Sequence, residues 1–168
     1  DMAIIDTDFH MSAPKGLTAA SGIDAVTHAV EAYVGQNSSP ISDALAAEAF
    51  RTAFALLGQS FSGKKEVRQR IHEAATMAGL AFTHGGLGLC HAMAHALGGR
   101  FHVPHGRLNA ILLPAVIDCN AHGAAAKYAK LARQAGLGGS ADTLGVRNLK
   151  NALIRLRQEL ELPQTLCQ

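Results

Sequence analysis

Apolar residues recur every three or four positions along most of the chain, which is the spacing of helices that bury one face. In the segment 23–34 this pattern runs through Ile23, Val26, Val30 and Val34. Comparable spacing predicts further helices over about 40–58, 65–83, 87–97, 107–121, 124–136 and 146–160. Residues 2–6, MAIID, form the one convincing strand pattern. We therefore predict an all-α protein, a helical bundle of six or seven helices.

Local signals mark the turns between these helices. Ser39 is expected to cap the helix that Pro40 begins, because serine accepts hydrogen bonds from free N–H groups and proline has no N–H to leave unpaired. The glycines of HGG at 84–86 are expected to end the third helix, and Pro114 to kink or break a later one. Segment 12–22 is expected to form turns with at most one helical turn, and segment 98–106 is expected to be loop. The inward faces of the second and third helices are expected to be Ile41, Leu45, Ala49, Phe50 and Phe54, and Val67, Ile71, Ala75, Ala78 and Leu80.

Composition narrows the classes of partner. The 168 residues are 48% hydrophobic and 17% charged, with a formal net charge of +2. No run of Lys or Arg is long enough to follow a phosphate backbone, so we expect no nucleic-acid partner. No apolar run approaches the roughly 18 residues of a membrane span, so we expect no membrane partner. The three cysteines show no CxxC spacing, which suits a reducing cytosol and a cytoplasmic protein.

Histidines are concentrated in one part of the chain, with five of the nine in residues 84–105. His91 and His95 are four residues apart on one predicted helix, and so are Asp24 and His28 on another, so each pair shares a helix face. His105 follows in the loop after the first pair. Divalent transition metals bind neutral imidazoles together with a carboxylate. Asp24, His28, His91 and His105 could thus supply three nitrogens and one oxygen to Fe²⁺ or Zn²⁺.

Each of these residues also has a structural interpretation. A single buried histidine is more often a core residue with a hydrogen-bond partner than a metal ligand. Asp24 alone could be a charge favoured near the N-terminus of its helix. Spacing by itself therefore predicts a metal site and no particular reaction.

Two motifs carry a family resemblance. The segment SGIDAVTHAVEAYV, followed by GLGLCHAMAHALGGRFHVPHGRLNAILLP, closely resembles the iron-containing, or group III, alcohol dehydrogenases. It is also similar to the alcohol dehydrogenase half of bifunctional aldehyde-alcohol dehydrogenases and to alcohol dehydrogenases of ethanolamine and propanediol utilisation. The resemblance covers essentially the whole chain. It implies the helical C-terminal domain of the dehydroquinate synthase-like fold.

The resemblance also implies roles for individual residues. The metal, Fe²⁺ or alternatively Zn²⁺, would be bound by Asp24, His28, His91 and His105. His95 would not be a ligand but would lie beside the nicotinamide and substrate, with a role in proton transfer or cofactor positioning. The implied reaction is metal-assisted hydride transfer between a short-chain alcohol or aldehyde and NAD(H). Three departures from the family pattern, Ala96, Arg107 and His84, leave all four ligands in place. Arg107 and His84 are expected to change the charge of the cleft and with it the substrate preference.

The family's first, nucleotide-binding domain has a glycine-rich motif of the GGGS type that this sequence lacks. The chain begins without Met and ends at LPQTLCQ, so we expect residues 1–168 to be the helical metal-binding domain of a longer protein, without its nucleotide-binding domain and its last helices. Its expected partners are that nucleotide-binding domain, the alcohol or aldehyde, and further copies of the subunit. Alone, the chain is expected to be inactive.

Other functions remain open at this point. The first alternative is a zinc-dependent polyol or glycerol dehydrogenase-like enzyme, although the segment GIDAVTHAVEAY favours the iron group over it. A metal-dependent hydrolase could use a metal-activated water with His95 as base. A helical module that binds a metal or a partner without catalysis is the third alternative. A nucleotide-binding domain upstream would favour the dehydrogenase.

Overall fold

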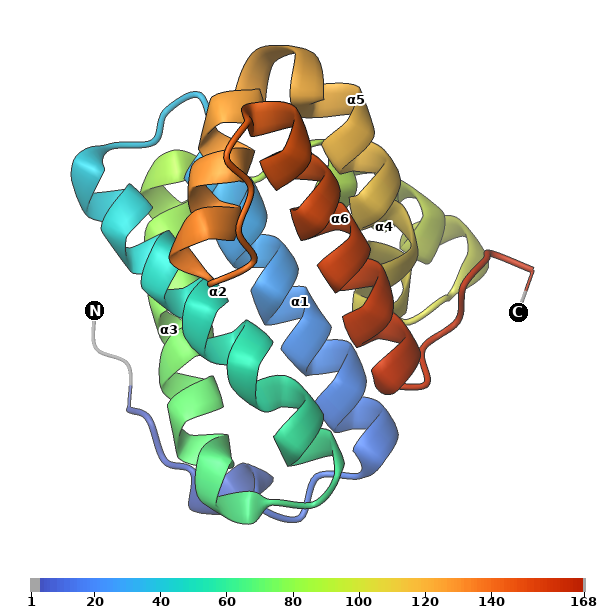
Figure 1. Ribbon diagram of the computed structural model, residues 1–168. Coiled ribbons are helices and arrows are strands. Elements are labelled where there is room, and N and C mark those ends of the chain that lie inside the picture. The colour runs from blue at the N-terminus through green and yellow to red at the C-terminus, as the bar shows by residue number, and fades with distance from the viewer. Residues whose placement is uncertain (1–3, 168) are drawn as a thin grey trace.

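The computed structural model describes residues 4–167, and within them the regular elements are all helical. Two short 3₁₀ turns, η1 (Asp8–His10) and η2 (Lys65–Val67), accompany the α-helices (Figure 1). The α-helices are α1 (Lys15–Val34), α2 (Pro40–Phe61), α3 (Arg68–Gly85), α4 (Leu89–Phe101), α5 (His105–Gln134) and α6 (Asp142–Glu159). The prediction of an all-α helical bundle is confirmed. None of these helices is long and apolar enough to cross a membrane.

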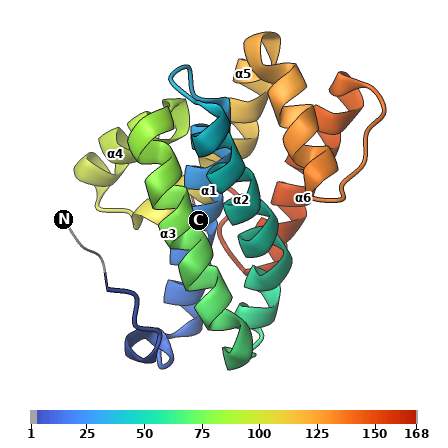
Figure 2. The same cartoon turned by 90° about the vertical axis from the view of Figure 1, so that its left-hand side faces the viewer.

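Helix α1 is the centre of the bundle. It packs against α2 and α3 on one side and α5 on another, while α6 covers α5 (Figures 1 and 2). Most of its core positions are small or β-branched, and Val26, Ala29 and Val30 are completely buried. Small side chains let the neighbouring helices approach closely. The buried core therefore runs along α1 from Ala19 to Tyr33, and a polar group buried in this stretch needs partners within the protein.

The predicted start of α2 and the predicted end of α3 are confirmed. The Ser39 side chain accepts a hydrogen bond from the backbone N–H of Ser42, whose own side chain accepts one from the N–H of Ser39. Pro40 follows at the first helical position. Gly86 ends α3 with a φ of 82°, a conformation that side chains other than glycine's adopt at a cost.

Other boundaries differ from the prediction. Helix α1 begins at Lys15, so most of the predicted turn region 12–22 is helical; Ala19 and Gly22 are buried there and extend the core. Helix α4 reaches Phe101, so the predicted loop is only the short connection before His105. Of the predicted strand, residues 2–3 lie outside the described part, and residues 4–6 form no strand.

Pro114 does not break its helix. The sequence predicts two helices over 107–121 and 124–136, but α5 is one uninterrupted helix from His105 to Gln134. Proline cannot donate to the carbonyl four residues earlier, which here belongs to Ala110. Arg157 of α6 donates a hydrogen bond from Nη1 to that carbonyl oxygen at 3.4 Å. A side chain from another helix thus replaces the missing backbone donor.

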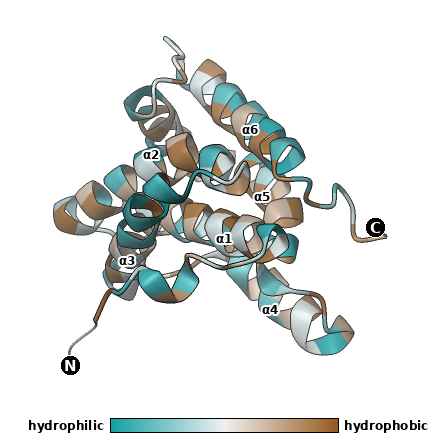
Figure 3. Ribbon diagram, turned by 90° about the horizontal axis from the view of Figure 1, so that it is seen from below, coloured by the Kyte–Doolittle hydropathy of each residue, from teal (hydrophilic) through white to brown (hydrophobic). Residues whose placement is uncertain are grey.

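The predicted inward faces are partly wrong. Ala49, Phe50 and Ala78 are buried as expected, but Ile41 is 76% and Leu80 is 52% exposed. Apart from Arg68 at its start, the buried positions of α3 are small residues spaced three or four apart, at 74, 78, 81 and 85, and Leu80 lies on the opposite side of this stripe. Figure 3 shows how hydrophilic and hydrophobic positions alternate around the helices, for example along α6. Close helix approach, rather than side-chain size, decides which face of α3 is buried.

Candidate metal centre

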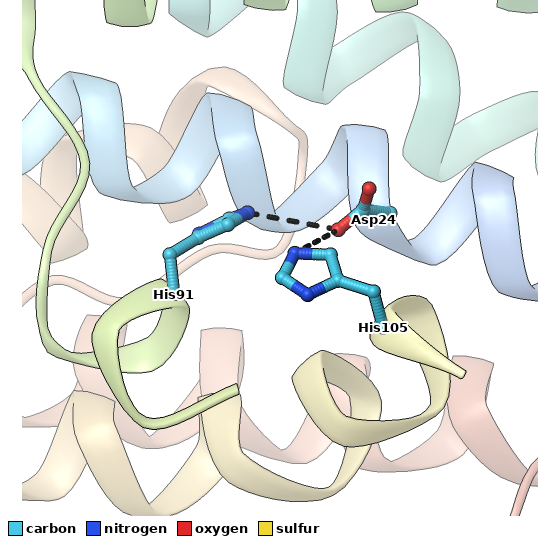
Figure 4. A group of neighbouring side chains, drawn as sticks. All are labelled: Asp24, His91 and His105. Atoms are coloured by element: carbon cyan, nitrogen blue, oxygen red, sulfur yellow. Dashed lines mark ion pairs between the residues drawn. The ribbon is translucent and has the colours of Figure 1, made fainter. Parts of the chain in front are cut away.

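The site begins as a polar stripe on the buried helix α1. Asp24, His28 and Glu31 lie four and then three residues apart, so they share one face of the helix. Helix α4 brings His91 to this face, and His105, the first residue of α5, reaches the same face. In Figure 4 both imidazoles point toward the carboxylate of Asp24, and each comes from a different helix.

Three ligand atoms converge at this point. The Asp24 Oδ1 atom lies 3.6 Å from Nε2 of His91 and 3.5 Å from Nε2 of His105. These three atoms lie within 4.8 Å of one another. Two ligands bound about 2.1 Å from a tetrahedral metal would be roughly 3.4 Å apart, close to the two shorter separations. The donor set of two imidazoles and one carboxylate therefore fits a divalent transition metal in both chemistry and spacing.

Asn109 is a site residue that the sequence analysis missed. It is completely buried, one turn after His105 on α5. Its Nδ2 donates to Asp24 Oδ1 at 2.5 Å and lies 3.1 Å from Nε2 of His105 and 3.2 Å from Nε2 of His91. The amide group thus faces all three ligand atoms. Its i+4 spacing after His105 was the only signal in the sequence.

Cys90 orients this amide. Its thiol donates to Oδ1 of Asn109 at 3.4 Å. Burial raises the pKa of the Cys90 thiol, so the thiol keeps its proton and acts as a donor at neutral pH. The oxygen of the Asn109 amide is thereby held toward Cys90, and its nitrogen toward the ligand atoms.

Glu31 is the second residue that the sequence analysis missed. Its Oε2 lies 2.6 Å from Nδ1 of His91, on the opposite side of the ring from Asp24. The carboxylate also accepts hydrogen bonds from backbone N–H groups at the start of α4. The signal in the sequence was its position seven residues after Asp24, which places both on one helix face.

The charged groups of the site shift one another's pKa values. Burial alone would raise the pKa of Asp24 and Glu31, but the hydrogen bonds with His91, followed for Asp24 by the charge of His28 and for Glu31 by the N–H groups of Gly88 and Cys90, hold both below their ordinary values. Burial opposes protonation of His91, yet its interactions with Asp24 and Glu31 outweigh this effect and raise its pKa to about 9. Without a metal, a proton on His91 thus offsets part of the negative charge.

The pKa values of the other two predicted histidine ligands, His28 and His105, shift in the opposite direction from that of His91. Burial lowers the pKa of both His28 and His105, which favours neutral imidazoles. The neutral form is the one that binds metals. His28 stacks its ring on that of His91 with centroids 4.5 Å apart, but its nitrogens are not among the three converging atoms. Its role as a fourth ligand stays a prediction.

His95 lies beside the cluster, one turn after His91 on α4. Its ring centroid is 4.9 Å from that of His105 and 6.2 Å from that of His91. The side chain is exposed and does not join the three ligand atoms. A substrate or cofactor that approaches the cluster from this side could contact it.

Fold and site together define a class: a helical domain in which a buried helix and the starts of two others form one carboxylate–imidazole cluster. The profile described as "Fe-containing alcohol dehydrogenase family, C-terminal" matches residues 18–168. The chain belongs to this family, as its two motifs indicated.

Individual relatives agree with this assignment. The chain is 42% identical to the NADPH-dependent butanol dehydrogenase of Clostridium saccharobutylicum, over 99% of this chain and 43% of the relative. It is 43% identical to the 1-propanol dehydrogenase PduQ of Citrobacter freundii, over 97% and 46%. The solved iron-containing alcohol dehydrogenase of Thermococcus thioreducens matches with a TM-score of 0.89 at 38% identity, over 97% of this chain and 42% of that one. The chain thus spans less than half the length of these relatives.

Proposed function

We propose that this chain supplies the metal and substrate half of an NAD(H)-dependent alcohol dehydrogenase that acts on short-chain primary alcohols or aldehydes. The observation that carries the proposal is the convergence of Asp24, His91 and His105 at distances suited to one divalent cation. Family membership and the names of the relatives, a butanol and a propanol dehydrogenase, support the class of substrate.

Asp24, His91 and His105 would bind the metal, Fe²⁺ or alternatively Zn²⁺, with His28 as the fourth ligand. When bound, such a metal acts as a Lewis acid toward an alcohol or carbonyl oxygen. Asp24 contributes the negative charge that a cation requires. The Asn109 amide donates to Asp24 Oδ1 and so helps to hold this carboxylate toward the two imidazoles.

His95 would contact the substrate or the nicotinamide and pass a proton to or from solvent. Its exposed ring lies close enough to His105 to border the same space. An imidazole in hydrogen-bond reach of a substrate can serve as a general acid or base. NAD as the cofactor stays a prediction from the sequence. The butanol dehydrogenase relative is named as NADPH-dependent, so the assay must include both nicotinamides.

We propose further that residues 1–168 act as the helical metal-binding domain beside a nucleotide-binding domain. The length of the relatives supports this arrangement. A contact surface is available on α4 and the turn before it, where Leu87, Leu89, Met93 and Phe101 are 39% to 60% exposed. Assembly into homo-oligomers and a cytoplasmic location stay predictions from the sequence.

The proposal is tested on the intact protein, meaning the longest natural chain that contains these residues. Loaded with Fe²⁺ or Zn²⁺, it should retain about one metal per subunit and oxidise 1-propanol or 1-butanol with NAD⁺ or NADP⁺. The 168-residue chain alone should bind the metal but show no oxidation, because it lacks a glycine-rich phosphate-binding turn. Equal rates from both proteins would contradict the two-domain proposal. Ester or amide hydrolysis without nicotinamide would favour the hydrolase.

A further inference from the structure

Glu31 is a buried carboxylate that the proposed reaction does not use. It lies on α1, and only 3% of the residue is exposed. A carboxylate removed from water is costly unless several donors surround it. The identity of its donors therefore indicates what it does.

All of the donors come from the start of α4. Oε1 accepts a hydrogen bond from the backbone N–H of Cys90 at 2.7 Å. Oε2 accepts one from the N–H of Gly88 at 3.0 Å and a longer one, 3.4 Å, from the N–H of His91. The same oxygen lies 2.6 Å from Nδ1 of the His91 ring. Glu31 thus contacts both the backbone and the side chain of one predicted metal ligand.

Helix α4 has no capping side chain of its own. Its N-cap residue is Gly88, so the free N–H groups of the first turn need an acceptor from elsewhere. Glu31 provides that acceptor together with a negative charge, which the N-terminal end of a helix favours. Gly88 also leaves the necessary space, because a Cβ atom there would lie 2.8 Å from Oε1 of Glu31. The start of α4 is therefore built to receive a carboxylate from α1.

We infer that Glu31 is a positioning residue of the metal centre, which anchors the start of α4 and holds the His91 ring with its hydrogen on Nδ1 and Nε2 turned toward Asp24. A carboxylate only accepts, so Nδ1 must carry the hydrogen, and the lone pair of Nε2 is left for the cation. Outer partners of metal-binding histidines typically change metal affinity by about 10- to 100-fold. The inference rests on the proposed metal centre.

The test substitutes Glu31→Gln in the intact protein. Glutamine keeps the size but replaces one acceptor oxygen with an NH₂ group, so either Cys90 N–H or His91 Nδ1 loses its acceptor. In a Co²⁺ titration against a competing chelator, we expect roughly 10- to 100-fold weaker binding and a changed visible absorption spectrum of the bound Co²⁺. The matched control is Glu48→Gln, a carboxylate on α2 that is bound to Arg51 away from the site. It should bind Co²⁺ as the wild type does.

The outcomes separate three possibilities. A variant that loses thermal stability but binds Co²⁺ with wild-type affinity and spectrum would show that Glu31 only caps α4, and the inference would be wrong. A wild-type protein that binds no Co²⁺ would refute the proposed metal centre, and this role of Glu31 with it. If the variant does not fold, ¹⁵N NMR of the histidine-labelled, Zn²⁺-loaded wild type decides. We expect hydrogen on Nδ1 of His91, and Zn²⁺ bound at Nδ1 would overturn the inference.

Discussion

The two helices that form most of the site are held in different ways. Helix α1 is buried among α2, α3 and α5, whereas α4 packs mainly against α5 and leaves Leu89 and Met93 about 40% exposed. The buried helix nevertheless carries the carboxylates, Asp24 and Glu31. They are tolerated there because donors from α4 and α5 satisfy them. The comparison teaches that the site forms where two differently buried helices meet. The buried helix α1 supplies the carboxylates, and the less buried α4 supplies hydrogen-bond donors to Glu31 and the imidazole of His91.

The largest effect should follow from removing both imidazoles that face Asp24. We expect the double variant His91→Ala, His105→Ala to lose stoichiometric metal. Its affinity should fall by more than the roughly 100-fold that loss of an outer partner can cause. Metal analysis after dialysis, with wild type and His72→Ala in parallel, provides the measurement. Unchanged metal content would remove both residues from the proposed centre.

The difference in burial predicts a difference in stability. Leu57 of α2 is completely buried, and its Cδ1 atom would lie 2.1 Å from a Cβ atom placed on Gly22 of α1. Leu57→Ala should lower the free energy of unfolding by about 2–5 kcal/mol, whereas Leu89→Ala on α4 should change it by about 0.5 kcal/mol or less. Urea denaturation of the 168-residue chain measures both.

A double variant sharpens this prediction. Gly22→Ala should cost less in the Leu57→Ala protein than in the wild type, because the clashing atoms are gone. Equal costs in the two backgrounds would contradict the close packing of α1 on α2. A larger cost of Leu89→Ala in the intact protein than in this chain would indicate that another domain covers α4.

The exposed histidine of α4 should affect turnover and not metal binding. His95→Ala in the intact protein is expected to keep its metal and to lower kcat by about 100-fold, the lower end for loss of a general acid–base group. The comparison with His91→Ala separates the two positions, which are one turn apart on the same helix. Loss of metal in His95→Ala would move His95 into the ligand set.

The effect of pH on metal affinity should be smaller than the effect of removing His91 and His105. A metal must displace the proton that Asp24 and Glu31 stabilise on His91, whose pKa is about 9 without metal. Apparent affinity should therefore fall by about tenfold for each pH unit below 9 on account of this residue. Co²⁺ titrations between pH 7 and pH 9 measure the slope. An affinity independent of pH would show that His91 is neutral in the metal-free protein.

The same shift affects the stability of the metal-free protein. Folding raises the pKa of His91 from 6.5 to about 9. The protonated ring therefore stabilises the folded state fully below about pH 6.5, and this stabilisation is lost as the pH rises through about 9. Denaturation midpoints of the metal-free protein should fall over this range. In His91→Gln this part of the pH dependence should be absent.

Features determined by neighbouring residues could be predicted from the sequence. The Ser39–Pro40 helix start, the glycine end of α3 and the i, i+4 pairs Asp24–His28 and His91–His95 depend on one or two helical turns. Because the helix repeat is fixed, these residues share a face whatever the rest of the fold does. The all-helical class and the convergence of Asp24, His91 and His105 followed from such local patterns together with the family motifs.

Tertiary structure alone decided the rest, because the partners are distant in sequence. Asn109 bonds to Asp24 across 85 positions, and Glu31 reaches Cys90 across 59. Helix α5 continues past Pro114, and Arg157 of α6 donates to the Ala110 carbonyl that proline cannot reach. Periodicity marks residues that share a face, but it carries no information on which distant donor meets a buried acceptor. A buried polar group must find a partner somewhere, and only the packing of the helices determines which one.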